Sequence, residues 1–454
     1  MNARSAFESS DGASAIATCA GCGCACDDID LTVNGNRVVE ARQACELGRT
    51  WFTEPAAPDG PSCRVAGKPA SLDEGIERAA QLLAAARYPL VYGLEQTSCE
   101  AVRLAVAIAD WIGAVLDTAS GASGGLAGLS LDGVGEVTCS LGEIANRADL
   151  VLVWRADPLV THPRHFSRYS LAPRGRFVPG GRADRSCVVI DVCRTESAEE
   201  ADLFLALRAG CDFEALWILR ALVRGAALRA DDVLAETGVE LSAWQGLSDR
   251  LKQAKFAVIL FDAHLSDAKA GHVQVDALWA LVRDLNAHTR AAAAPLLADG
   301  NAAGAASVIC SRTGAPSAVN LARGYPRFNP GEYSAEEVLA RREVDAVLTV
   351  AAGRMSNLSP AARRHLASTT RVTIDSDPTV DGASATVAFT TAPHGRAAAG
   401  TIFRMDGVPL PLRPALVSPH PSDVEILARL ESRVKQLCAG PKRPAAPDSA
   451  VKLP

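Results

Sequence analysis

The stretch Cys19-Ala20-Gly21-Cys22-Gly23-Cys24-Ala25-Cys26 gathers four of the chain's thirteen cysteines near the amino terminus, and Cys45 follows within the first tenth of the sequence. Cys19, Cys22 and Cys26 have a C-x2-C-x3-C spacing, and the glycines between them let the backbone fold tightly around a metal centre. Cys45 completes a set of four thiolates, and Cys24 is left out of it. Such a set predicts an iron–sulfur cluster, and a tetrahedral zinc ion would accept the same ligands.

The segment Asp28–Glu40 predicts a hairpin, because two alternating runs flank the dipeptide Asn34-Gly35. A hairpin would return the chain and carry Cys45 back towards the first three cysteines. The alternative is chance clustering of small buried thiols, which explains the spacing less well.

Composition and charge restrict the class of protein. The chain has 454 residues, 48% of them hydrophobic and 22% charged, which is typical of a globular protein of two to four domains. Its formal net charge of −6 argues against a nucleic-acid partner. The amino terminus lacks the apolar core of a signal peptide, and no window reaches the ~18 apolar residues of a membrane span. We expect a cytoplasmic protein without a membrane partner, its thiols reduced.

From about residue 86, short aliphatic strands alternate with helical stretches. This alternation predicts parallel sheets covered by helices on both faces. The fold class is therefore α/β, with a small Fe–S-type amino-terminal subdomain and two doubly wound parallel-sheet domains. The predicted strands are Tyr88–Gly93, Ala114–Asp117, Asp149–Trp154, Cys187–Asp191, Phe256–Phe261, Ala346–Val350 and Arg371–Asp375, and an apolar helix is expected over Cys99–Trp111.

Polar residues follow several of these strands. Ligands of open parallel sheets bind beyond the carboxyl ends of the strands, so Asp157, Asp191 and Arg194 are candidate nucleotide contacts. An aspartate in such a place is also a common helix cap or turn residue, which is the alternative for any one of them.

A cysteine-rich unit followed by paired α/β domains is the layout of molybdenum or tungsten pterin oxidoreductases. Local sequences extend the likeness: together they closely resemble the B-type subunit of formylmethanofuran dehydrogenase, from about Cys19 to Val434. The blocks that carry this resemblance are Cys22–Ile29, Ala44–Gly48, Asn146–Asp149, His162–Ser170, Gly181–Arg185, Arg323–Glu332 and Arg404–Pro409.

The resemblance implies one of two functions. Archaeal members of the family reduce carbon dioxide to formate at a tungsten or molybdenum bis-pterin fed by a 4Fe–4S cluster, and a companion subunit formylates methanofuran. In methylotrophic bacteria the similar subunit is part of the formyltransferase/hydrolase complex of tetrahydromethanopterin-linked one-carbon metabolism, whose chemistry lies in other subunits. Either way, the implied partners are the other subunits of such a complex.

Three departures from the dehydrogenase pattern favour the second function. Ala122 and Ser123 align with the metal-ligating cysteine and the histidine after it, and Leu297 aligns with an active-site arginine. None of the three can ligate the metal, donate a proton near neutral pH or hold a carboxylate. We therefore expect no redox catalysis, and so no catalytic residue. The alternative is an active enzyme with a displaced ligand, such as Cys139.

The pterin-side loop of the family is partly retained in Asn301, Gly304, Arg312, Thr313 and Gly314, which are candidate cofactor-binding residues. Without a metal ligand, two pterins would have little to hold them, so we expect no molybdenum or tungsten bis-pterin. The four cysteines are intact, and a 4Fe–4S cluster could persist as a structural group, with zinc as the alternative.

The motif His162–Ser170 has two histidines and two arginines. We interpret His162 and His165 as packing and hydrogen-bonding residues, because two histidines without a third ligand do not define a metal site. Its arginines could join others in an anion-binding surface, or form ion pairs with the excess carboxylates. The arginines considered are Arg164, Arg168, Arg323 and Arg327.

The domain limits are expected as follows. Residues 1–65 form the cysteine-rich subdomain and end in a Pro-rich linker at 54–61. Residues 66–135 and 300–438 form a discontinuous α/β domain, and 136–299 form a second α/β domain inserted into it. Residues 439–454 are expected to be a flexible tail.

Overall fold

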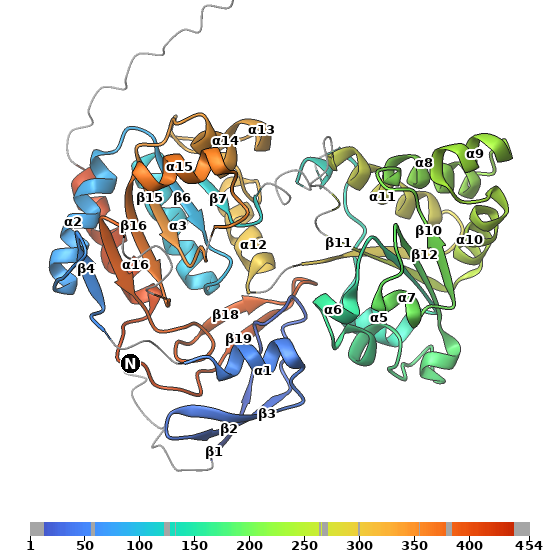
Figure 1. Cartoon of the computed structure of the whole chain (residues 1–454), viewed down its shortest axis with the longest axis horizontal. Helices are drawn as coiled ribbons and strands as arrows, with labels where there is room; N and C mark the ends of the chain where they lie inside the picture. The colour runs from blue at the N-terminus through green and yellow to red at the C-terminus, as the bar shows by residue number, and fades with distance from the viewer. Residues whose placement is uncertain are drawn as a thin grey trace, which may run out of the picture.

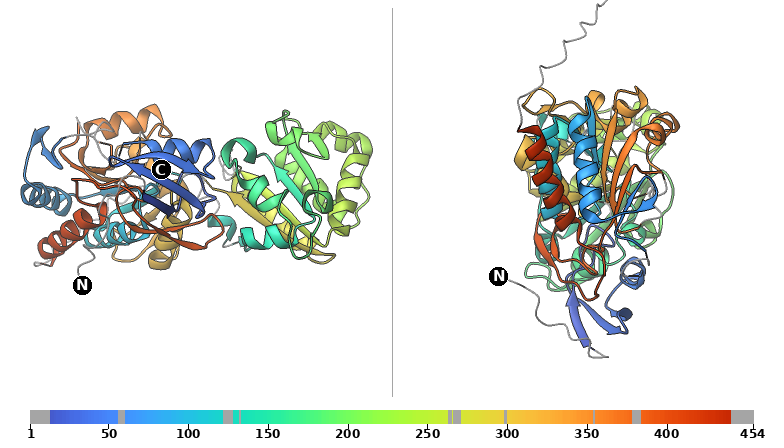
Figure 2. Two further views of the ribbon diagram at one scale, coloured as in Figure 1. Left: turned by 90° about the horizontal axis from the view of Figure 1, so that it is seen from below. Right: turned by 90° about the vertical axis from the view of Figure 1, so that its left-hand side faces the viewer.

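The computed structural model describes residues 13–55, 60–121, 128–131, 133–262, 265, 271–297, 300–353, 355–377 and 384–439. Two α/β bodies lie side by side, and a small β unit from the amino-terminal segment packs beneath them (Figure 1). The same arrangement, elongated along one direction, is visible from below in Figure 2.

The amino-terminal unit is an antiparallel sheet in the order β1-β2-β3, followed by a helix that starts directly after Cys45. Asn34 pairs with Arg37, so Gly35 and Asn36 form the two-residue turn; their φ values are +54° and +58°. The predicted hairpin is confirmed. The first strand was not expected from the sequence. The elements are β1 (Ala13–Ala17), β2 (Ile29–Asn34), β3 (Arg37–Arg42) and α1 (Glu46–Thr53).

The larger α/β body is built on a nine-stranded sheet in the order β14-β13-β7-β6-β15-β16-β17-β4-β5. Its five central strands are parallel, and antiparallel strands extend both edges. The strands are β4 (Cys63–Val65), β5 (Lys68–Pro69), β6 (Pro89–Gly93), β7 (Val115–Thr118), β13 (Val319–Asn320), β14 (Arg327–Phe328), β15 (Ala346–Val350), β16 (Thr370–Asp375) and β17 (Val387–Thr390).

Helices cover both faces of this sheet. One buried core joins it to α2 (Leu72–Ala85), α3 (Cys99–Ile112), α12 (Ala302–Thr313) and α16 (Asp423–Cys438). On the other face a second core involves α13 (Pro330–Tyr333), α14 (Ala335–Ala340) and α15 (Pro360–Ser368). The sheet neighbours β6 and β15 mark the point where the winding direction reverses.

The smaller α/β body contains a fully parallel five-stranded sheet in the order β10-β9-β8-β11-β12. The strand order reverses between β8 and β11. In doubly wound sheets, ligands bind at such a reversal, beyond the carboxyl ends of the strands. The strands are β8 (Leu150–Trp154), β9 (Ser186–Asp191), β10 (Leu203–Ala206), β11 (Phe256–Asp262) and β12 (Arg290–Leu296).

One face of this sheet packs on α8 (Asp212–Val223), α9 (Ala230–Thr237), α10 (Leu241–Gln253) and α11 (Gly271–Leu285). The core on the other face is continuous with the amino-terminal unit, since it joins Ile29 and Leu31 to Ile144 and Phe166. The shorter elements on this side are α5 (Leu141–Arg147), α6 (Pro158–Thr161), the π-helix η1 (Phe166–Ser170), the 3-10 helix η2 (Gly181–Asp184) and α7 (Glu196–Glu199).

A late hairpin, β18 (Gly400–Phe403) with β19 (Pro409–Leu412), closes over the cysteine-rich loop. Its Ile402, Leu410 and Leu412 form a core with Ala20 and Ala25. The amino-terminal unit therefore packs between the β18–β19 hairpin and the smaller body. Among the described helices, none has the length and apolar character of a membrane span.

The strands of the five-stranded sheet all fall within 150–296, between the two chain segments that build the nine-stranded sheet. The domain limits 1–65, 66–135 with 300–438, and 136–299 stay predictions. Half of the linker at 54–61 and nearly all of the tail at 439–454 lie outside the described residues.

Candidate functional site

The four cysteines predicted as metal ligands line one small cavity. Cys19, Cys22, Cys26 and Cys45 share its wall with Ile29, Ala44, Gly48 and Arg164, among others. The first three are buried, and Cys45 is partly exposed immediately before α1. The β2–β3 hairpin returns the chain between Cys26 and Cys45, which is why thiols distant in sequence meet here.

Glycines leave room for the sulfur atoms at this cavity, which we call the cysteine cavity. A Cβ atom on Gly48 would lie 3.2 Å from Cys19 Sγ and 3.9 Å from Cys45 Sγ, and one on Gly21 would lie 3.4 Å from Cys19 Sγ. The N–H of Gly21 donates to Cys19 Sγ over 3.3 Å. A backbone N–H that donates a hydrogen bond to sulfur, and glycines that leave space beside the sulfur atoms, are typical of a site where thiolates hold a metal group.

Two arginines of the His162–Ser170 motif approach the cysteine cavity and form ion pairs there. Arg164 donates to both carboxylate oxygens of Asp28 at 2.7 Å, and Arg168 donates to Asp27 at 2.7 Å. Burial raises the pKa of the Cys26 thiol, and the charge of Arg164 opposes that rise. The ion-pair interpretation of these two arginines is thus confirmed.

Cys24 is fully buried and is not among the residues that line the cysteine cavity. Across the described part of the chain, no three His, Cys, Asp or Glu side chains come close enough together to hold a single metal ion. The four thiols therefore surround a shared space without converging on one point.

A second cavity lies beside the first, at the carboxyl edge of the five-stranded sheet. It measures about 380 Å³, and its wall includes Cys22 and Leu47 from the amino-terminal unit. Ala156, Asp262 and Leu296 come from the ends of β8, β11 and β12, so the cavity sits at the reversal of strand order. We call it the switch pocket; Gly21, Val160, Thr161, His162 and Leu297 complete its lining.

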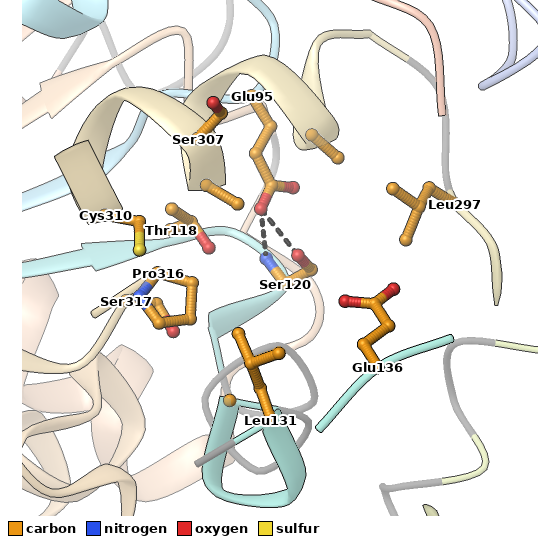
Figure 3. Close-up of a pocket in the computed structure, with 13 residues that line it drawn as sticks. Glu95, Thr118, Ser120, Leu131, Glu136, Leu297, Ser307, Cys310, Pro316 and Ser317 are labelled. Carbon is orange, nitrogen blue, oxygen red and sulfur yellow. Dashed lines mark hydrogen bonds between the residues drawn. The ribbon is translucent and has the colours of Figure 1, made fainter. Parts of the chain in front are cut away.

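A third cavity of about 360 Å³, the Glu95 pocket, lies at the carboxyl edge of the larger sheet (Figure 3). Glu95 is buried and points into it, accepting hydrogen bonds from the N–H of Ser120 at 3.1 Å and its hydroxyl at 2.6 Å. Glu136 faces the same space near Leu297. The other described lining residues are Thr118, Gly128, Leu131, Ala302, Ala306, Ser307, Cys310, Pro316 and Ser317.

Leu297 belongs to the walls of both the switch pocket and the Glu95 pocket. Its carbonyl oxygen accepts a hydrogen bond from Nε2 of His162 at 2.8 Å. The same oxygen packs closely on Gly23, where a Cβ atom would lie only 2.5 Å from it. The chain thus places an apolar side chain at the boundary of the two cavities. Ala122 and Ser123, the other two departures, lie outside the described residues.

The histidines of the motif are hydrogen-bonded packing residues. His165 is fully buried, with Nδ1 2.9 Å from the hydroxyl of Ser170, and burial lowers its pKa to about 3. Burial also lowers the pKa of His162. Both rings are therefore neutral near pH 7.

The candidate nucleotide contacts have structural partners. Asp157 accepts from the N–H groups of Glu196 and Ser197 at 3.1 and 3.0 Å, and so holds the start of α7. Asp191 pairs with Arg155 at 2.5 Å. Arg194 pairs with Glu199 on the surface at 3.1 Å. Their role in nucleotide binding stays a prediction.

The five candidates of the pterin-side loop lie at the two ends of α12. Asn301 precedes the helix, fully buried, and its amide donates to the carbonyl of Thr97 at 2.9 Å. A Cβ on Gly304 would collide with that amide, at 2.0 Å from Oδ1 of Asn301. At the other end, Arg312 is exposed, Thr313 ends the helix and Gly314 is its left-handed cap with φ +84°.

Sequence reasoning missed the polar residues of the Glu95 pocket. Glu95 comes just after β6, and an acidic residue near the end of a buried strand is a signal of the kind applied to Asp157. Glu136 and Ser307 had no local signal. Cys139, the displaced ligand of the alternative, is buried but lines neither pocket.

No model in a scan of protein families matches the chain. The B-type subunit of the tungsten-containing formylmethanofuran dehydrogenase 2 of Methanocaldococcus jannaschii is 34% identical over 430 residues, 92% of this chain and 98% of the relative. The B-type subunit of the formyltransferase/hydrolase complex Fhc of Methylorubrum extorquens is 28% identical over 287 residues, 63% of this chain and 74% of that protein.

Two solved structures share the fold. A chain in the crystal structure of the FhcABCD complex of M. extorquens with methylofuran superposes with a TM-score of 0.68 and 24% identity, covering 82% of this chain and 99% of that one. Acetylene hydratase from Pelobacter acetylenicus gives 0.64 and 12%, covering 93% and 69%. With the full-length identity to the archaeal relative, the likeness is decisive: the chain belongs to the family of formylmethanofuran dehydrogenase B-type subunits.

Proposed function

We propose that this chain is a non-redox structural B-type subunit of a formyltransferase/hydrolase complex, acting in the tetrahydromethanopterin-linked oxidation of formaldehyde to formate. Its partners are the other subunits of that complex, in line with the relative from M. extorquens and with the multi-subunit structure that shares its fold. The catalytic steps would then belong to those partners.

The observation that carries the proposal is the place of Leu297. Leu297 lines both the switch pocket and the Glu95 pocket, and the family resemblance gives its position to an arginine that could hold formate. No Lys, Arg or His is among the described residues lining the Glu95 pocket, and two carboxylates are. A formate ion would be repelled there.

The residues that the structure describes, which leave out 122–127, do not fit a molybdenum or tungsten bis-pterin centre with a cysteine ligand. Among the described residues, the one thiol of the Glu95 pocket is Cys310, which lies at the opposite end from Leu297 (Figure 3). The thiol that the switch pocket offers is Cys22, which also lines the cysteine cavity.

The residues do fit a 4Fe–4S cluster in the cysteine cavity. Cys19, Cys22, Cys26 and Cys45 would hold it, and Gly21 and Gly48 leave space beside the sulfur atoms. Bound there, the cluster would supply thiolate–iron bonds that fasten the amino-terminal loop to α1. Zinc, the alternative occupant, fits the described side chains less well, because no three of them come close enough to hold a single ion.

An active molybdenum or tungsten enzyme is the second candidate, favoured by the higher identity and coverage of the archaeal tungsten-containing relative. Metal analysis of the anaerobically purified chain separates the two. We expect iron with the broad visible absorption of a cluster, and neither tungsten nor molybdenum. Stoichiometric tungsten or molybdenum with pterin fluorescence would contradict the proposal, and zinc without iron would contradict the cluster.

A pair of cysteine variants sharpens this test. Cys26→Ser should lower the iron content several-fold, because one of four ligands is lost. Cys193→Ser, at an exposed cysteine away from the cavity, should leave the iron content unchanged. Equal iron in both variants would place the iron elsewhere.

A further inference from the structure

An exposed phenylalanine lies between arginines on the side of the smaller body away from the pockets. Phe177 is 56% exposed, and the guanidinium carbons of Arg147 and Arg176 lie 5.1 and 5.6 Å from its ring centroid. Arg147 also stacks on Phe256, the first residue of β11, so the cluster sits at the amino edge of the sheet. We call Arg147, Arg174, Arg176 and Phe177 the Phe177 platform.

The backbone beneath the platform is fixed. The N–H groups of Phe177 and Arg176 donate to the main-chain and side-chain oxygens of Asn146 at 2.9 and 3.2 Å. A Cβ on Gly175 would lie 2.3 Å from the carbonyl of Ala145, so only glycine allows this approach. Phe177 is therefore held outward by the fold and is not the tip of a loose loop.

A buried arginine fastens the loop further. Arg185 donates to the carbonyl oxygens of Ile144 and Ala148 and to those of Ala145 and Pro173, at 2.5 to 3.1 Å. It thereby ties the end of α5 to the start of the platform loop. Such prior ordering lowers the entropy lost when a partner binds.

The platform is positively charged. Within the described residues, Arg147, Arg174 and Arg176 form no ion pair with a carboxylate. The carboxylates of Asp149 and Asp184 lie in neighbouring loops, where Asp149 accepts from the N–H groups of Lys255 and Phe256 and Asp184 accepts from that of Gly180. A basic, aromatic patch thus stands out on a chain whose net charge is −6.

We propose that the Phe177 platform is the docking site for an acidic surface of another subunit of the complex; this rests on the proposed function. Arginine and aromatic side chains are enriched at the centres of protein interfaces. An acidic partner would pair with the three guanidinium groups and cover the ring, and the opposite charges would speed association. A nucleic-acid partner fits the platform less well, because the chain is acidic overall and the platform has only three arginines.

The test uses the full-length chain co-expressed with the other subunits of its own complex, with affinity measured on the purified components. The variant Arg147→Glu/Arg176→Glu/Phe177→Ala should weaken binding at least ten-fold at 150 mM salt, a loss expected on removing interface hot spots. Raising the salt concentration should weaken the wild type and leave the variant nearly unaffected. The matched control Phe213→Ala/Arg224→Glu/Arg229→Glu, with the same change in charge on another exposed face of the same body, should bind within about two-fold of the wild type.

The outcomes distinguish a failure of the docking inference from a failure of the proposed function. If the wild type binds the other subunits and the platform variant binds equally well, the docking inference is wrong and the proposed function stands. If the wild type binds none of them, the proposed function itself fails. A fluorescent single-stranded oligonucleotide that binds the wild type and not the variant would assign the platform to nucleic acid. Circular dichroism that matches between variant and wild type confirms that the variant is folded.

Discussion

At the scale of single residues, glycines decide what the cysteine cavity can contain. Gly48 has no side chain where a Cβ would stand 3.2 Å from Cys19 Sγ, a separation tighter than ordinary contact. The role of a cysteine is readable from its spacing, whereas the role of Gly48 depends on which sulfur the fold brings beside it.

Replacing Gly48 by alanine should therefore lower iron incorporation by the purified chain, because the new methyl group displaces Cys19 Sγ from the cavity. The measurement is iron per chain, with thermal unfolding recorded in parallel. The control is Gly246→Ala, in α10, where a Cβ meets nothing within 4 Å. That variant should keep its iron and gain about 0.5–1 kcal/mol from helix propensity. Equal iron in both would show that the cavity tolerates the methyl group.

At the scale of elements, the π-helix η1 joins the amino-terminal unit to the smaller body. His165 is the residue before it, and its ring is buried beside Tyr169 with a centroid distance of 6.0 Å. Burial lowers the pKa of His165 to about 3, with the charge of His162 acting in the same direction and Asp406 opposing it. The helix therefore depends on a neutral imidazole.

This burial should make the protein sensitive to acid. The unfolded chain protonates His165 near pH 6.5 and the folded chain only near pH 3, so the unfolded state binds more protons between these values. The free energy of unfolding is lost as the pH falls through this window, by up to about 5 kcal/mol for the full difference.

His165→Phe should shift the midpoint of acid unfolding to lower pH, because the ring stays apolar and Ser170 keeps its bond to the carbonyl of residue 165. The exposed His288→Gln serves as the control and should not shift the midpoint. Acid unfolding followed by fluorescence measures both. A midpoint unchanged by His165→Phe would mean that other groups control acid unfolding.

At the scale of the whole molecule, the amino-terminal unit is attached to the smaller body by a continuous core and by ion pairs. Arg164 binds Asp28 through two hydrogen bonds, and their side chains are 18% and 35% exposed. Since a two-pronged pair of this kind is stronger than a surface contact, it should contribute to the attachment.

A double-mutant cycle with Arg164→Ala and Asp28→Ala should give a coupling of about 1 kcal/mol in the free energy of unfolding. The same cycle on the exposed pair Arg194 and Glu199 should give a value near zero. Denaturant unfolding measures both cycles. Equal couplings would mean that the attachment depends on apolar packing alone.

The order of residues along the chain was enough to predict the central strands and the hairpin, and to pick out the four cysteines that line one cavity; their role as metal ligands stays a prediction. Continuous aliphatic runs such as Leu150–Trp154 favour buried strands by their own composition, and a cysteine spacing is a local property. The alanine-rich β12 (Arg290–Leu296) was missed, because a run of alanines with one proline has no strand signal of its own.

Which polar groups meet, by contrast, depends on the packing of the whole chain. Asn301 and Gly314 read as one loop in the sequence, yet they flank a 12-residue helix about 18 Å long. Glu95 and Glu136 share a pocket, and Leu297 lines two pockets, because the packing brings together segments that are far apart in the chain. Local sequence carries the pattern of burial along one element, whereas the neighbours of a side chain are set by the packing of elements far apart in the chain.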